Sequence, residues 1–171
     1  MFVSSLIRYP AISPQRLQSG EFVRNPAHSD FGTLTLLFQQ DVGGLQIADM
    51  SSTDKTTSAG IEKSGKFVHV DPKRGSIIVN TGYLLMRWTN GRWKNTVHRV
   101  LEPPGSVWTA QDIDDSGWMV PERYSIAFFS FPDAATVVEP LPTCCSDQEP
   151  KKWGPINAGE YLLKKRAATY S

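Results

Sequence analysis

Two histidine-containing segments constrain the fold most strongly, because they lie far apart in the sequence yet carry side chains that suit one shared site. They are His28-Ser29-Asp30 and His98-Arg99-Val100. On a β-strand, residues i and i+2 point to the same face, so the side chains of His28 and Asp30 are expected to converge. Two imidazoles and one carboxylate on one side of a metal leave its other side open, which suits mononuclear non-haem iron. The fold must therefore bring His98 beside the first pair.

Short β-type segments separated by turn signals predict a mainly β fold. Asn90-Gly91, between aromatic residues, predicts a hairpin turn. The polar segment 50–64 is expected to be a mobile loop, residues 103–121 a second long loop, and residues 157–165 a helix. This pattern is typical of a sandwich or barrel, such as an eight-stranded jelly roll of the cupin type. The candidate strands are residues 31–38, 41–47, 67–70, 76–80 and 123–131.

Size and charge narrow the class of protein further. The chain has 171 residues, enough for one domain with a sizeable core. Its net charge of +1 gives no electrostatic case for binding nucleic acid or an anionic membrane. No apolar run approaches the roughly 20 residues needed to cross a bilayer. Cys144 and Cys145 are adjacent, so we expect reduced thiols and a cytoplasmic protein.

A second pair of side chains is expected to bind a carboxylate. Arg123 and Ser125 are also spaced i and i+2, so a guanidinium and a hydroxyl are predicted to share one strand face. The guanidinium fork grips a carboxylate through two parallel hydrogen bonds, and the hydroxyl adds a third donor. The pair therefore suits the far carboxylate of a dicarboxylic acid. Tyr9 is a candidate donor to the same ligand, with packing in the core as the alternative.

Taken together, these motifs resemble the 2-oxoglutarate- and iron(II)-dependent dioxygenases, in the branch that includes isopenicillin N synthase. The resemblance covers nearly the whole chain, and the motifs occur in the same order. The matching stretches are Arg8-Tyr9-Pro10, residues 28–37, Gly43-Gly44-Leu45-Gln46, residues 87–91, residues 95–100, residues 123–129 and residues 158–162.

The resemblance implies a double-stranded β-helix (a cupin-like jelly roll) over residues 1–135, followed by a tail, 136–171, whose helix packs on the domain. It implies that His28, Asp30 and His98 are the catalytic Fe(II) ligands. Arg123, Ser125 and Tyr9 would then bind 2-oxoglutarate. With O2, and with ascorbate as a reductant, the implied reaction hydroxylates or desaturates a small molecule and releases succinate.

Three points qualify this interpretation. Members of the branch usually carry a substantial N-terminal region before the part seen here, so we expect a truncated form or fragment whose uncovered surface favours self-association. A catalytically weak or inactive remnant that acts as a binding domain is the alternative function, and a cupin-like zinc or manganese enzyme is a third. Relatives often have an acidic residue where this chain has Tyr83.

Overall fold

The computed structural model describes residues 1–52, 57–103 and 119–169, and its strands form two four-stranded antiparallel sheets and a two-stranded one. The first sheet has the order β1-β8-β3-β6 and the second β2-β7-β4-β5. The strands of the first sheet are β1 (Phe2–Tyr9), β8 (Arg123–Ser130), β3 (Leu34–Gln39) and β6 (Ile78–Thr81). Those of the second are β2 (Asn25–His28), β7 (His98–Val100), β4 (Leu45–Asp49) and β5 (Lys66–His69).

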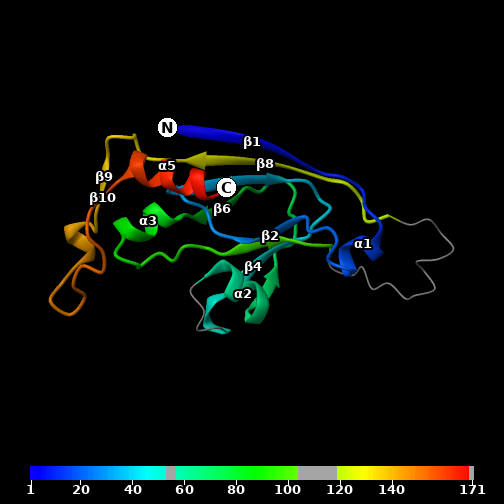
Figure 1. Cartoon of the computed structure of the whole chain (residues 1–171), viewed down its shortest axis with the longest axis horizontal. Coiled ribbons are helices and arrows are strands. Elements are labelled where there is room, and N and C mark those ends of the chain that lie inside the picture. Colours follow the sequence, from blue (N-terminus) through cyan, green and yellow to red (C-terminus); the bar gives the residue numbers. More distant parts are fainter. Residues whose placement is uncertain (53–56, 104–118, 170–171) are drawn as a thin grey trace.

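The chain passes repeatedly from one sheet to the other. β1, β3, β6 and β8 belong to the first sheet, whereas β2, β4, β5 and β7 belong to the second. In Figure 1, β1 and β8 run side by side along one side of the molecule, and β2 and β4 lie across from them. This alternation is the winding of a double-stranded β-helix, which confirms the predicted mainly β jelly roll.

Side-chain alternation explains why the two sheets pack face to face. Along β8, Arg123, Ser125 and Ala127 are buried while the residues between them are more exposed, the period of two expected for a strand with one covered face. The core between the sheets is built on Tyr9, Leu45 and Val100. Around it pack Ile7, Leu37, Val70 and Ile78.

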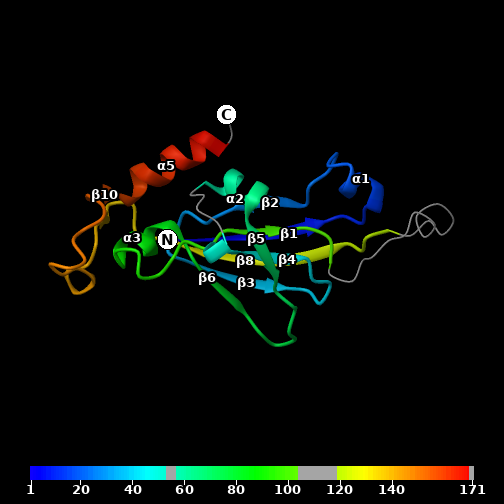
Figure 2. The same cartoon turned by 90° about the horizontal axis from the view of Figure 1, so that it is seen from below.

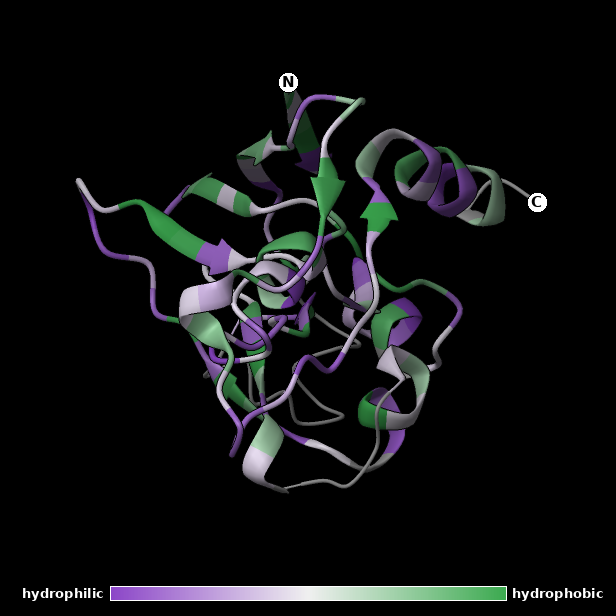
Figure 3. Cartoon of the chain, turned by 90° about the vertical axis from the view of Figure 1, so that its left-hand side faces the viewer, coloured by the Kyte–Doolittle hydropathy of each residue, from purple (hydrophilic) through white to green (hydrophobic). Residues whose placement is uncertain are grey.

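The last part of the chain forms a small structure at one end of the sheets. β9 (Val137–Val138) pairs with β10 (Ile156–Asn157), and α5 (Ala158–Thr169) follows at once, which confirms the predicted C-terminal helix. Leu84 of α3 (Tyr83–Trp88), Val138 and Ala158 are fully buried together. Figure 2 shows α5 running out from β10, apart from the strands of the two sheets. Figure 3 shows that α5 mixes apolar and charged residues. The boundary between residues 135 and 136 stays a prediction.

Short helices complete the fold. They are α1 (Pro14–Gln18), α2 (Ser58–Ser64), and the 3-10 helices η1 (Met50–Ser52) and η2 (Pro142–Cys144). Within the described ranges, no helix has both the length and the apolar character that a membrane crossing requires.

The prediction that residues 50–64 form a mobile loop is wrong, because η1 and α2 occupy most of this segment. The Thr57 side chain caps α2 by accepting a hydrogen bond from the Gly60 N–H at 3.2 Å. Ile61 is buried against Ala48 and Val97, so a single apolar side chain anchors the helix. Residues 53–56 lie outside the described ranges, as do residues 104–118 of the predicted loop 103–121.

The hairpin expected at Asn90-Gly91 is also wrong, since these residues end α3. Both have positive φ, 51° at Asn90 and 79° at Gly91. The Gly91 N–H donates to the Met86 carbonyl at 2.8 Å, a pattern that satisfies an otherwise unpaired carbonyl at a helix C-terminus. The Asn-Gly pair therefore adopts left-handed backbone after a helix and not in the turn of a hairpin.

Candidate active site

Strand pairing brings the two histidines together. His28 is the last residue of β2, His98 is the first residue of β7, and the two are cross-strand partners. Their rings are tilted by 59°, with centroids 4.3 Å apart. The expected meeting of the two histidine segments is therefore found in the ladder of the second sheet.

Each imidazole is oriented by a backbone carbonyl two residues earlier. Nδ1 of His28 lies 2.8 Å from the Pro26 carbonyl oxygen, and Nδ1 of His98 lies 3.1 Å from that of Thr96. A carbonyl can only accept, so each Nδ1 acts as the donor, and Nε2 is the nitrogen that the neutral form of each imidazole offers to a metal. Two lone pairs are thus available to a metal, and their direction is fixed by the backbone.

Asp30 reaches the histidines from the connection between β2 and β3. The i, i+2 spacing predicts that Asp30 lies on the same strand as His28, but that strand ends at His28. The carboxylate is held by hydrogen bonds to its Oδ2, from the Thr35 hydroxyl at 2.5 Å and the Asn80 amide at 2.8 Å. These two donors come from β3 and β6 of the opposite sheet. Oδ1, the other oxygen, lies 4.0 Å from His98 Nε2.

The three side chains form one compact group. One nitrogen of each histidine and a carboxylate oxygen of Asp30 all lie within 4.8 Å of one another, and no other such trio of histidine, cysteine or acidic residues occurs among the described residues. Burial lowers the pKa of His98, the neighbouring His28 imidazole lowers it further, and the Asp30 carboxylate opposes both effects. The resulting neutral imidazole is the form that binds a metal.

The second predicted pair lies deeper between the sheets. Arg123 has no exposed surface, and its Nη1 donates to the Ser125 hydroxyl at 3.2 Å. Its Nη2 donates to Gln39 Oε1 at 2.9 Å, a partner that the sequence analysis missed. The Tyr9 ring faces the guanidinium, with 5.1 Å between the Arg123 Cζ and the ring centroid. Burial lowers the pKa of Arg123, and Tyr9 opposes this shift.

An inner cavity joins the two groups of side chains. His28, Asp30 and His98 line one part of it, and Tyr9, Arg123 and Ser125 line another. Apolar side chains complete the wall, namely Ile7, Leu37, Leu45, Val100, Ala127 and Phe129. Such a cavity suits an elongated ligand that carries a polar group at each end.

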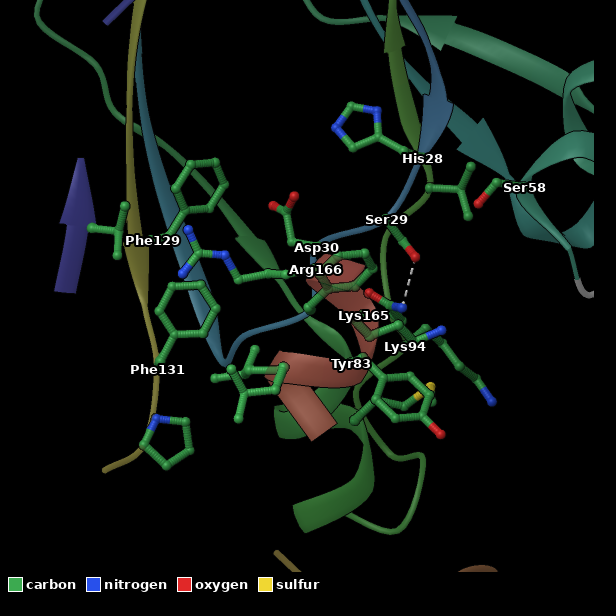
Figure 4. A pocket seen from close by; sticks show the side chains of 18 of the residues that line it. His28, Ser29, Asp30, Ser58, Tyr83, Lys94, Phe129, Phe131, Lys165 and Arg166 are labelled. Atoms are coloured by element: carbon green, nitrogen blue, oxygen red, sulfur yellow. Dashed lines mark hydrogen bonds between the residues drawn. The ribbon is translucent and has the colours of Figure 1, made fainter. Parts of the chain in front are cut away.

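A wide outer groove opens beside His28 and Asp30, with a volume of about 1600 Å³. In Figure 4, Phe129 and Phe131 lie on one side of it and Ser58 and Lys94 on the other, with His28 and Asp30 between them. His28, Asp30 and Phe129 line both the groove and the inner cavity. His28 and Asp30 therefore lie where the two spaces meet. Tyr83 also lines the groove, and its hydroxyl accepts a hydrogen bond from Arg87 at 3.2 Å.

The residues present fit an iron ion and a dicarboxylate. The metal-binding group offers two neutral nitrogens and one carboxylate, the donor set of the facial iron sites. The Arg123 Nε is buried and has no hydrogen-bond partner. A buried cation with an unused donor is costly unless a ligand satisfies it, and a carboxylate is the natural acceptor.

Comparison with known proteins agrees with this chemistry. The model of the 2OG-Fe(II) oxygenase superfamily matches residues 4–132. The chain therefore belongs to the 2-oxoglutarate- and iron(II)-dependent oxygenases, as the sequence motifs predicted.

Individual relatives are similar over nearly the whole chain. The 2-oxoglutarate-dependent dioxygenase gloF of Glarea lozoyensis is 38% identical over 95% of this chain and 44% of its own length. The 2-oxoglutarate-Fe(II) type oxidoreductase ppzD of Metarhizium rileyi is 36% identical over 96% of this chain and 41% of its own. A full-length Neurospora crassa protein crystallised with alpha-KG superposes with a TM-score of 0.78, at 35% identity over 99% of this chain and 45% of that one. The chain thus spans less than half the length of these relatives.

Proposed function

We propose that this chain forms the catalytic core of a dioxygenase that oxidises a small organic molecule with O2 and 2-oxoglutarate. His28, Asp30 and His98 are the proposed Fe(II) ligands. One oxygen atom of O2 enters the substrate in a hydroxylation, and the other enters 2-oxoglutarate, which becomes succinate and CO2. Desaturation of the substrate is the variant outcome. Bound Fe(II) supplies the redox chemistry with O2 and the co-substrate.

One observation carries the proposal: the metal-binding group and a buried, incompletely satisfied Arg123 line the same inner cavity. On this proposal, Arg123 and Ser125 hold the distal carboxylate of 2-oxoglutarate, and the Tyr9 ring covers the guanidinium. Leu37, Leu45 and Val100 exclude water from the middle of the co-substrate.

The ligand side chains contribute by orientation. The Pro26 and Thr96 carbonyls fix the two imidazoles, and Thr35 and Asn80 occupy Asp30 Oδ2 so that Oδ1 faces the histidines. This arrangement gathers the three ligand atoms before the ion binds, which lowers the cost of binding it.

The outer groove is the proposed substrate site, because His28 and Asp30 line it as well as the inner cavity. Its aromatic and aliphatic lining suits a compact organic molecule. The Neurospora crassa protein has also been crystallised with alpha-KG and thymine, which supports a small-molecule substrate here. The use of ascorbate, self-association and a cytoplasmic location stay predictions.

Succinate formation tests the proposal. With Fe(II), ascorbate, O2 and 2-oxoglutarate, the chain is expected to release succinate, and His98→Ala is expected to abolish the release. His69→Ala is the matched control, because His69 pairs with Gln46 and is outside the metal-binding group. Binding of Fe(II) and 2-oxoglutarate without succinate, across a panel of small organic acids and bases, would favour the binding-domain alternative.

A further inference from the structure

We infer that Glu62 of α2 is a positioning residue that sets the spacing between the two histidines, an inference that rests on the proposed metal site. One carboxylate connects the two strands that carry them. Glu62 Oε2 accepts a hydrogen bond from the backbone N–H of Ala27, which directly precedes His28. Glu62 Oε1 accepts from Nη1 of Arg99, which directly follows His98, at 2.6 Å.

The bond to Ala27 replaces a missing contact of the sheet. The register of β2 and β7 shifts between Asn25 and His28, so the ladder is irregular immediately before the histidine. Pro26 lies in this stretch and has no N–H to donate. Glu62 supplies the acceptor for the Ala27 N–H, and it thereby holds the irregular end of β2 against α2.

The Arg99 side chain, which donates to Glu62, is itself held in place by other residues. The Arg99 guanidinium lies over the Phe67 ring, with 3.6 Å between Cζ and the centroid, and its Nε donates to Gln46 Oε1 at 2.8 Å. These contacts tie the side chain to β5 and β4. Arg99 and Glu62 are largely covered, with 18% and 31% of their side chains exposed. Partial burial strengthens such an ion pair relative to one on the open surface.

The helix that carries Glu62 is itself fixed to the fold. Ile61, the preceding residue, is 1% exposed and packs on Ala48 of β4 and Val97, the residue before His98. α2 therefore contacts both histidine-bearing segments, through an apolar side chain and through a carboxylate. Its Ser58 and Ile61 also line the outer groove, so the same short helix contacts both the proposed substrate site and the histidine-bearing segments.

Anaerobic titration with Co(II), a spectroscopic substitute for Fe(II), tests this role. Glu62→Ala is expected to raise the Kd for Co(II) about 10-fold, the low end of the effect of losing a direct hydrogen-bond partner of a metal ligand, because Glu62 acts through Ala27 and Arg99. It should also change the visible Co(II) spectrum, which reports the geometry of the ligands. Glu62→Gln keeps an acceptor for Ala27 but loses the ion pair with Arg99, so we expect an intermediate Kd.

Glu139→Gln is the matched control, because Glu139 pairs with Lys151 at 3.0 Å on the surface and does not line the site. A merely structural role would lower the unfolding temperature of the Glu62 variants and leave both the Kd and the spectrum of the folded protein unchanged, and that result would overturn the inference. If Glu62→Ala does not fold, the Kd for Co(II) and the visible spectrum of Glu62→Gln are compared with those of the parent chain, and an unchanged Kd and spectrum would again overturn the inference. Failure of the parent chain to bind Co(II) would instead overturn the proposed metal site, and the positioning role with it.

Discussion

His28 and His98 are cross-strand partners at the junction of β2 and β7, with their ring centroids 4.3 Å apart. The ladder of the second sheet therefore sets how far apart the two imidazoles lie, and backbone carbonyls set how they are turned. Asp30 comes from outside this ladder and is held by residues of the opposite sheet. The metal-binding group thus joins the two sheets of the fold, and a bound ion should stabilise their packing.

A bound divalent metal is expected to stabilise the chain against unfolding. At a free Co(II) concentration about 100 times the Kd, the free energy of unfolding should rise by about 2.7 kcal/mol, because the ion binds only the folded chain. Anaerobic thermal or urea unfolding, with and without the ion, measures this. His98→Ala should lose the increase and His69→Ala should keep it; an equal increase in both variants would contradict the assigned ligand.

Thr35→Val is expected to weaken metal binding, because it removes the hydroxyl that donates to Asp30 Oδ2. Asp30 Oδ2 then keeps only the Asn80 donor and is held less firmly, so metal affinity should fall about 10-fold or more. Thr33→Val is the control, since the Thr33 hydroxyl donates instead to the Ser130 carbonyl at 2.9 Å. Isothermal titration of both variants with Co(II) should give a higher Kd for Thr35→Val than for Thr33→Val. Equal Kd values would mean that metal binding by Asp30 does not depend on the Thr35 hydroxyl.

Arg123→Met is expected to reduce the affinity for 2-oxoglutarate by at least about 30-fold, because losing one partner of a buried charge pair costs about 2–5 kcal/mol. Ser125→Ala removes a single hydroxyl and should cost about 0.5–1.5 kcal/mol. The measurement is a 2-oxoglutarate titration in the presence of metal. Arg8→Met controls for loss of charge, because Arg8 is exposed on the neighbouring strand and pairs with Glu122. Unchanged 2-oxoglutarate affinity in Arg123→Met would place the co-substrate elsewhere.

Gly91→Ala is expected to destabilise the end of α3. Its φ of 79° strains any residue with a Cβ, by about 1–2 kcal/mol, and the new Cβ would lie 3.2 Å from the Trp153 ring. Gly75→Ala is the matched control, with φ 75° and no atom within 4 Å of its Cβ, so it should show the backbone strain alone. Urea unfolding should give the larger loss for Gly91→Ala. Equal losses in the free energy of unfolding would show that the Trp153 ring moves away from the new Cβ at no measurable cost.

Much of the fold and of the candidate site could be predicted because it depends on local spacing. Arg123 and Ser125 share a face of β8 as their i, i+2 spacing predicts, and the buried and exposed residues of that strand alternate. The sequence motifs predicted that His98 lies near His28, but not that the two are cross-strand partners, because spacing along the sequence does not reveal strand register. The order of the motifs indicated that the histidines meet, and the pairing of β2 with β7 in the second sheet shows how they do so.

The partners of the site could not be predicted, because they come from distant strands. Asn80 and Gln39 are ordinary polar residues of β6 and β3 in the sequence, and only the fold brings them to Asp30 and Arg123. Asp30 lies beyond the end of β2, so its approach to the histidines depends on these tertiary contacts. α2 was missed because its helical segment is short and polar, with Ile61 as its one fully buried side chain.

Anaerobic equilibrium dialysis of the chain against Fe(II) and 2-oxoglutarate determines whether His28, Asp30 and His98 form an iron site. We expect one ferrous ion per chain, one 2-oxoglutarate that is retained only with the metal, and loss of the metal in His98→Ala but not in His69→Ala. A folded chain that retains no ferrous ion, or that retains it equally well without the His98 imidazole, would contradict this expectation.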